Sequence, residues 1–124
     1  MEGWTVHRGQ GLWRANRSAP EIAGEVLVAI HPREPAVVQF AKPPFNLVAA
    51  RVAASAWEVE FPAEQKHYRG GGDPPHRLIW PFIPAIIEGG PRPKNWTVFE
   101  SAKGHWQFEN IKTGERLQLI LSER

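Results

Sequence analysis

The chain has no cysteine, and its 124 residues include only one aspartate, one methionine and one tyrosine. The lack of cysteine excludes disulfides, thiolate nucleophiles and cysteine-ligated metals. Because Asp73 is the only aspartate, we expect no hidden Ser-His-Asp triad. The histidines have none of the spacings of a metal site; they are His7, His31, His67, His76 and His105. We therefore expect no catalytic site, metal or cofactor, and a protein that is not an enzyme, although the sequence leaves open whether His67 and His105 meet in the fold.

Two further patterns with catalytic potential are weak. Glu58 and Glu60 lie two apart on one predicted strand, about 7 Å from each other, which is within the range of paired carboxylates in glycoside hydrolases. Their face is the polar one and the pattern supplies no pocket, so we interpret them as solvated side chains. Residues 8–11 contain two glycines without the third of a phosphate loop, and residues 70–72 are predicted to be a flexible turn.

Long hydrophobic runs and clusters of one charge are also missing. No apolar run approaches the length of a membrane span, and residues 1–6 show no basic region followed by an apolar stretch, so we expect no signal peptide within this sequence. The formal net charge is only +2 and the basic residues are scattered, which is weak evidence for a nucleic-acid partner. With 42% apolar residues, the composition is that of a single globular domain over residues 1–124.

Alternation of apolar and polar residues dominates the chain and predicts strands. The clearest cases are residues 57–61, where two glutamates separate apolar residues, and residues 106–109. The other predicted strands cover residues 25–30, 37–41, 46–52, 65–68, 96–100 and 117–121. Residues 110–115 are predicted to form a hairpin connection with Gly114 in the positive-φ position. Residues 1–20 are interpreted as an N-terminal extension.

One region has a helical character. Residues 75–89 form a dense apolar patch that contains Pro81 and Pro84, and Gly89 with Gly90 supplies a helix end. The prolines predict one or two short helices instead of a continuous one. Because so apolar a patch does not stay exposed, we expect residues 74–89 to form a lid on the concave face of an antiparallel sheet. The predicted fold class is α+β and mainly β.

The stretch 37–48 is the most informative part of the sequence. Two strand-forming runs flank the dipeptide Pro43-Pro44 followed by Phe45, which predicts a stiff loop with an aromatic ring where no core can cover it. Such a tip suits contact with a membrane or an apolar partner. The alternative is that the ring folds back and packs on the end of the sheet. Lys42 either contacts lipid phosphate, worth about 1 kcal/mol near an anionic surface, or is simply solvated.

This order of elements resembles the bacterial lipoprotein-localisation family, which includes the periplasmic lipoprotein carrier and the outer-membrane lipoprotein receptor. The resemblance covers about residues 24–121 and is best at 38–47, 65–68 and 83–91. It implies an incomplete β-barrel whose hollow, under a short helical lid, holds acyl chains, and a location in the periplasm or at the periplasmic face of the outer membrane. It also gives Phe45, stiffened by Pro43 and Pro44, the role of the receptor's membrane-contacting residue. The chain is shorter than typical members and lacks the receptor's lipid-bearing cysteine.

The resemblance implies transport of lipid or lipoprotein acyl chains, for which an apolar trough suffices because each buried methylene contributes about 0.8 kcal/mol. The residues expected to line the trough and lid are Val28, Ile30, Val38, Phe40, Leu47, Trp57, Val59, Phe61, Leu78, Ile79, Phe82, Ile83, Ile86, Trp106 and Phe108. Each of these taken alone is equally well interpreted as an ordinary core residue.

Two other classes of function stay open. Small curved β-domains bind single-stranded nucleic acid through exposed aromatic and basic residues, here Arg14, Arg17, Arg51, Arg69 and Arg77. Because the aromatic residues fall on the apolar face with few basic neighbours, we expect no nucleic-acid partner. The third class is a protein-interaction domain that recruits a partner strand to an exposed sheet edge.

Overall fold

The computed structural model describes residues 2–123 and consists of nine strands with a few short helical turns. In chain order the strands are β1 (Thr5–Arg14), β2 (Glu21–Ile30), β3 (Ala36–Lys42), β4 (Phe45–Val52), β5 (Ala56–Phe61), β6 (Lys66–Gly71), β7 (Trp96–Ala102), β8 (His105–Asn110) and β9 (Arg116–Glu123). The helical elements are the 3-10 turns η1 (Pro62–Glu64) and η2 (Trp80–Phe82) and the helix α1 (Ile83–Ile87). Within residues 2–123, no helix has the length and apolar character needed to cross a membrane.

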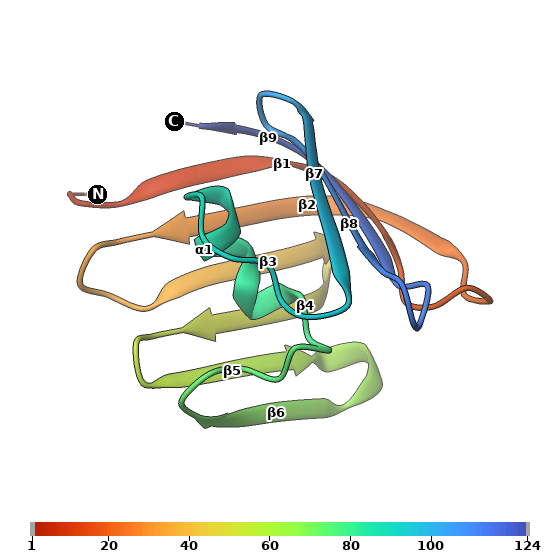
Figure 1. Ribbon diagram of the computed structural model, residues 1–124, viewed down its shortest axis with the longest axis horizontal. Coiled ribbons are helices and arrows are strands. Elements are labelled where there is room, and N and C mark those ends of the chain that lie inside the picture. The colour runs from red at the N-terminus through yellow and green to blue at the C-terminus, as the bar shows by residue number, and fades with distance from the viewer. Residues whose placement is uncertain (1, 124) are drawn as a thin grey trace.

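All strands belong to one antiparallel sheet in the order β6-β5-β4-β3-β2-β1-β9-β8-β7 (Figure 1). Consecutive strands are neighbours except β6 and β7, between which the lid segment intervenes, and β1 pairs with β9 so that the two ends of the chain meet inside the sheet. The sheet does not close into a barrel, and β6 and β7 form its two edges. The predicted class, mainly β with a curved antiparallel sheet and a short helical lid, is confirmed.

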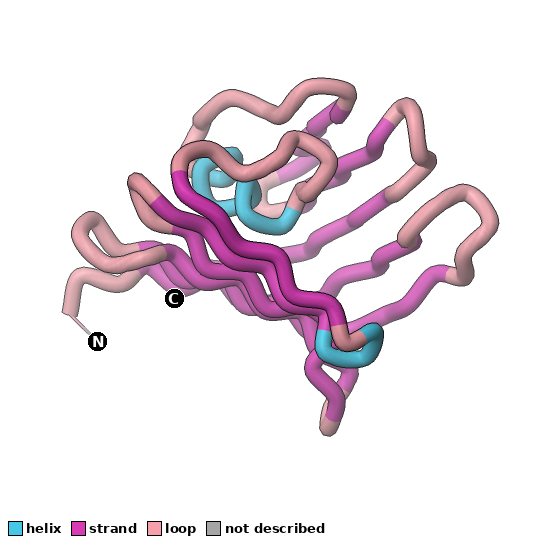
Figure 2. The backbone as a smooth tube through the Cα atoms, turned by 90° about the horizontal axis from the view of Figure 1, so that it is seen from below, coloured by secondary structure: helices cyan, strands magenta, loops and turns pink. Residues whose placement is uncertain are grey.

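The sheet is strongly curved (Figure 2), and a pair of glycines accommodates the curvature. Gly11 of β1 lies directly opposite Gly24 of β2. A Cβ atom on Gly24 would lie 2.8 Å from the ring of Phe40, and one on Gly11 would lie 2.8 Å from a methyl group of Val26. The missing side chains therefore leave the space on the concave face that the Phe40 ring occupies.

The lid, residues 74–89, lies on the concave face of the sheet, as predicted (Figure 1). Its regular helical part is shorter than the predicted segment and begins only at Trp80. Gly89, at φ 92°, follows the helix in the left-handed conformation expected of a terminating glycine. The start of the segment is tied to the first residue of β7, because the Trp96 indole N–H donates to the carbonyl oxygen of His76 over 2.7 Å.

Each predicted strand is present, and most are longer than predicted. The hairpin connection at residues 110–115 is also confirmed, with Gly114 at φ 77°. The structure corrects two interpretations. The stretch 1–20 contains β1, a central strand that the sequence pattern hides because glycines interrupt it. The predicted flexible turn at residues 70–72 is in part an extension of β6, which runs to Gly71.

Candidate functional site

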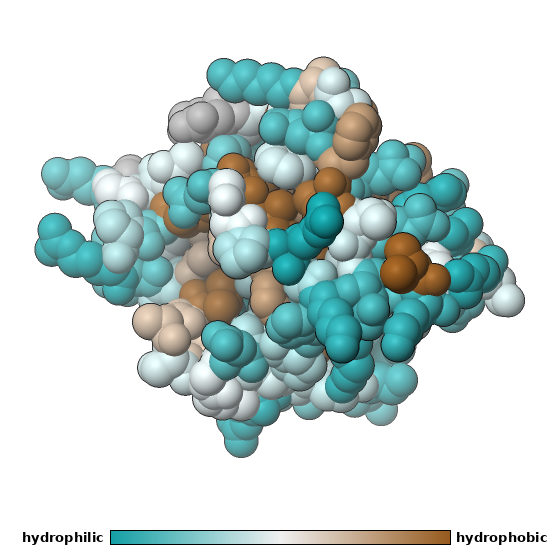
Figure 3. Space-filling model, in the orientation of Figure 1, coloured by the Kyte–Doolittle hydropathy of each residue, from teal (hydrophilic) through white to brown (hydrophobic). Residues whose placement is uncertain are grey.

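The residues predicted to bind acyl chains all belong to the core under the lid or pack against it. Val28, Val38 and Phe40 of the sheet are completely buried, as are Ile79 and Ile83 of the lid. The sequence therefore predicted correctly that these side chains lie between the sheet and the lid. In this structure the lid residues themselves cover that face. Figure 3 shows apolar atoms near the centre of the lid side of the molecule, with hydrophilic atoms around them.

Several cavities reach the margin of this core. They touch Leu47, Trp57, Phe61, Leu78 and Trp106, which lie near strand ends or at the start of the lid. An acyl chain reaches the fully buried residues only if the lid moves.

The lid contains one unsatisfied polar atom. The indole nitrogen of Trp80 is buried and has no hydrogen-bond partner among residues 2–123. A buried donor without a partner costs about 1–3 kcal/mol. This cost opposes the closed position of the lid, which apolar burial holds in place.

The predicted membrane-contact loop is the hairpin between β3 and β4. Phe45 has 69% of its surface exposed, so the ring does not fold back onto the end of the sheet. Beside it, Pro44, Leu47, Pro62 and Ala63 line a shallow groove together with Lys42 and Asn46. The tip is thus an apolar surface with a lysine at its margin.

Another cavity lies at the end of the curved sheet where the β1–β2, β5–β6 and β8–β9 connections gather (Figure 1). We call this cavity of about 250 Å³ the mouth. Its walls come from segments far apart in the sequence. They are Trp13 and Ala15 of the β1 end, Phe61, Glu64, Lys66 and Tyr68 around η1, Arg77, Leu78 and Trp80 of the lid, and Thr113 and Glu115 of the last hairpin.

Glu115 is the electrostatically unusual residue of the mouth. Its Oε2 atom accepts a hydrogen bond of 2.9 Å from the indole N–H of Trp13. Burial raises the pKa of Glu115 from 4.5 to about 7, and the Trp13 hydrogen bond opposes this rise only in part. Near neutral pH this carboxyl group therefore exists in both charge states.

The hairpin that carries Glu115 is held rigidly. The Arg14 guanidinium donates to the carbonyl oxygen of Gly114 at 2.9 Å, and Arg17 donates to the carbonyl oxygens of Lys112 and Ile111. The buried Asn110 side chain accepts from two backbone N–H groups of the turn. These bonds fix the position from which Glu115 faces the mouth.

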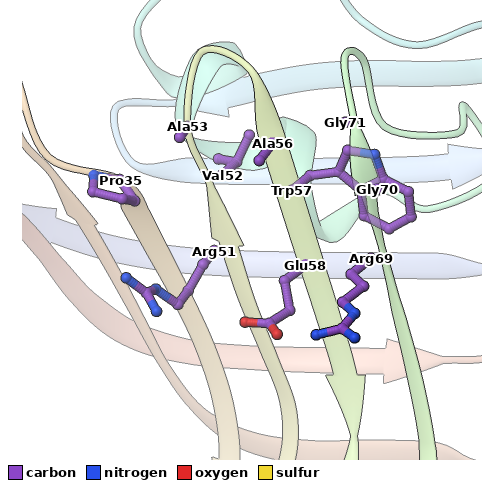
Figure 4. Close-up of a pocket in the computed structure, with 10 residues that line it drawn as sticks. All are labelled: Pro35, Arg51, Val52, Ala53, Ala56, Trp57, Glu58, Arg69, Gly70 and Gly71. Carbon is purple, nitrogen blue, oxygen red and sulfur yellow. The ribbon is translucent and has the colours of Figure 1, made fainter.

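A larger groove than the mouth, of about 650 Å³, crosses β4, β5 and β6 and is open to solvent (Figure 4). Arg51, Glu58 and Arg69 are direct cross-strand neighbours in it. Glu58 Oε2 accepts a 2.7 Å hydrogen bond from His67 Nε2. Residues 2–123 contain no group of three or more side chains that could hold a metal ion. The Glu58 side chain thus takes part in a surface ladder of alternating charge.

The arginines considered for nucleic-acid binding do not share one surface patch. Arg51 and Arg69 line the large groove, Arg77 lines the mouth, and Arg14 and Arg17 bond to hairpin carbonyl groups. Comparison of the sequence with protein-family models and with curated proteins gives no match.

Sequence reasoning missed the mouth altogether. Trp13 and Glu115 are 102 residues apart and their contact exists only because β1 pairs with β9. Arg77, whose guanidinium carbon lies 5.1 Å from the centre of the Tyr68 ring, was considered only for nucleic-acid binding. No local pattern in the sequence indicates these pairings.

Proposed function

We propose that this protein binds lipid or lipoprotein acyl chains without enzymatic activity, and that the Phe45 tip contacts the membrane. The observation that carries the proposal is the exposure of Phe45, which at 69% is the most exposed of the large apolar side chains. A ring held out in water by Pro43 and Pro44 loses apolar hydration when it enters a bilayer interface.

The surroundings of the tip support this role. Pro44, Leu47 and Pro62 extend the apolar surface next to Phe45, and Lys42 lines the same groove, which brings a positive charge that attracts lipid phosphates close to the tip. An apolar centre with a basic margin is the combination that favours peripheral attachment to an anionic membrane.

The core under the lid supplies the second element of the proposal. An acyl chain that displaces the lid buries its methylenes on the sheet while lid side chains such as Ile79 and Ile83 lose their burial, so the two hydrophobic contributions oppose each other. The opening also returns the Trp80 N–H to water. The similar order of elements in the lipoprotein-localisation family is our reason for extending the proposal to lipoproteins and the bacterial envelope.

The Phe45→Glu variant tests the membrane contact. We expect its association with vesicles that contain phosphatidylglycerol to fall at least tenfold in co-sedimentation, because a charged side chain cannot enter the interface. The matched control is Phe99→Glu, since Phe99 is similarly exposed, at 62%, but lies on the edge strand β7, which β3, β2, β1, β9 and β8 separate from β4. Equal losses in both variants, or no loss in Phe45→Glu, would refute the contact.

Salt dependence separates this proposal from nucleic-acid binding. We expect retention on vesicles to change little with salt and any binding to single-stranded oligonucleotides to be weak; strong, steeply salt-dependent oligonucleotide binding would favour the other class.

One observation favours a protein partner as a second candidate. The edge strand β6 carries Lys66, His67 and Arg69, which protect it from pairing with another strand. The other edge, β7, has only Glu100 as a charged residue and exposes Phe99. Strand addition at β7 is therefore the alternative, and a partner lost in Phe99→Glu but kept in Phe45→Glu would support it.

A further inference from the structure

The mouth has an aromatic wall. The Trp13 ring packs against Phe61, with centroids 6.3 Å apart, and against Trp80 at 5.6 Å. Phe61 in turn lies edge to face with Tyr68 at 6.2 Å. The faces of such rings carry a negative electrostatic potential that attracts cations. A ring face of this wall that borders the cavity favours a positively charged group over a negatively charged one.

The wall already holds one cation. The Arg77 guanidinium lies above the Tyr68 ring at 5.1 Å, within the range of cation–π interactions. It makes no salt bridge with another described residue. Arg77 is exposed to solvent, so its contact shows only that the Tyr68 ring at the rim accepts a cation on its face.

Glu115 supplies a negative charge on the other side of the mouth. Its hydrogen bond with Trp13 uses Oε2 only, and Oε1 has no partner among residues 2–123. No Lys, Arg or His of that part of the chain lies within salt-bridge distance of the Glu115 carboxyl group. A purely structural role as a clamp on β1 would explain the bonded oxygen but leaves the free oxygen and the cavity beside it unexplained.

We propose that the mouth binds a primary ammonium group, carried either by a small free amine or by the headgroup of an aminolipid. The aromatic faces attract its charge, and Glu115 Oε1 accepts one of its N–H bonds. A primary ammonium fits better than a quaternary one because only the former can donate to this oxygen. The cavity of about 250 Å³ has room for a small alkylammonium ion.

The mouth is also lined by charged side chains other than Glu115, and their effect on an ammonium group has to be considered. Glu64 and Lys66 form an ion pair of 3.6 Å at the rim, so they largely offset each other. Arg77 lines the mouth and repels an incoming cation, and Arg14, bonded to the Gly114 carbonyl oxygen beside Glu115, adds a second positive charge nearby. The binding of a free amine does not depend on the proposed membrane role, although η1 lines both the mouth and the groove beside Phe45.

The test uses n-butylammonium and isothermal titration calorimetry on the intact protein. We expect Glu115→Gln to weaken binding at least tenfold at pH 8, because the amide keeps an acceptor for the Trp13 N–H but removes the charge. The matched control is Glu21→Gln, which removes a carboxylate that pairs with Arg116 away from the mouth and leaves binding unchanged. Unaltered binding in Glu115→Gln, equal losses in both variants, or no binding to the unmodified protein overturns the proposal.

Two further measurements probe the mechanism. Arg77→Gln should tighten butylammonium binding a few-fold because it removes a repelling charge, and weaker binding would contradict the proposal. Binding to the unmodified protein should strengthen about tenfold from pH 6 to pH 8 as Glu115 ionises, and this dependence should vanish in Glu115→Gln. A pH dependence that persists in the variant would count against Glu115 as the acceptor.

The source of the ammonium group is decided with vesicles. For an aminolipid, Glu115→Gln weakens binding to phosphatidylethanolamine–phosphatidylglycerol vesicles but not to phosphatidylcholine–phosphatidylglycerol vesicles. Butylammonium binding without this headgroup dependence assigns the site to a free amine. Phe45→Glu should leave butylammonium binding unchanged, so a failure of the membrane proposal is distinguishable from a failure of this one.

Discussion

At the scale of single residues, Glu115 is the position where burial most alters chemistry. Its carboxyl group is partly covered by aromatic side chains and stabilised by one hydrogen bond from Trp13. Desolvation outweighs that bond and raises the pKa to about 7. Because the pKa of Glu115 is higher in the folded state, the native protein keeps the Glu115 proton up to a higher pH than the unfolded chain does.

This residue therefore predicts a pH dependence of stability. Between pH 4.5 and about 7 the native state holds more protons than the unfolded state, so the free energy of unfolding should fall as pH rises, by on the order of 2 kcal/mol after allowance for partial exposure. Glu115→Gln should remove this fall and be more stable than the unmodified protein at pH 8. Urea denaturation of both proteins at pH 4.5 and pH 8 measures this fall in the free energy of unfolding. An identical pH slope in both proteins would show that another group is responsible.

At the scale of elements, the pairing of β1 with β2 determines how far the sheet can curve. Gly11 and Gly24 face each other and leave space for Phe40, which also stacks on Trp80 of the lid with centroids 5.6 Å apart. A side chain at either glycine would force the Phe40 ring away from its place. The contact between sheet and lid thus depends on two residues that have no side chain.

Gly24→Val tests this dependence. The new side chain would meet both the Phe40 ring and the carbonyl oxygen of Ala41, 2.6 Å from the Cβ position, so we expect a loss of at least about 2 kcal/mol of stability. Gly71→Ala is the control, because its Cβ meets only the Ser55 carbonyl oxygen at 3.5 Å, and it should change stability by less than about 0.5 kcal/mol. Chemical denaturation compares the two. Similar stabilities would mean that the curvature does not need an empty position here.

At the scale of the whole molecule, different interactions hold the open sheet together and hold the lid on it. The strands are joined by continuous ladders, whereas the lid is held by apolar burial, a few turn hydrogen bonds and the His76–Trp96 contact. Lid side chains such as Ile79 and Ile83 are fully buried in the core, so opening of the lid without unfolding of the sheet would expose apolar surface. The proposed acyl-chain binding requires that kind of opening.

Hydrogen exchange tests whether the lid opens separately. The amides of Phe82, Glu88 and Gly89 donate to lid carbonyl groups, and we expect them to exchange at least a hundredfold faster than the amides of β2 and β3. Equal protection in the lid and in these strands would mean that the lid opens only with global unfolding, which would argue against acyl-chain entry under it. The amide of Gly72, an exposed residue at the end of an edge hairpin whose N–H donates to the Ser55 carbonyl oxygen, serves as the reference for local opening outside the lid.

The sequence by itself determined most of the strands, the short proline-bearing lid and the apolar face that it covers. These features depend on alternation, prolines and glycines, which act over a few residues and are visible in the printed chain. The exposed position of Phe45 was one of two possibilities that local pattern left open. Only the tertiary structure decided it, and only the tertiary structure revealed β1 as a central strand and the mouth around Glu115. The physical reason is that pairing between β1 and β9, and the desolvation of a carboxyl group by distant rings, depend on contacts between the two ends of the chain.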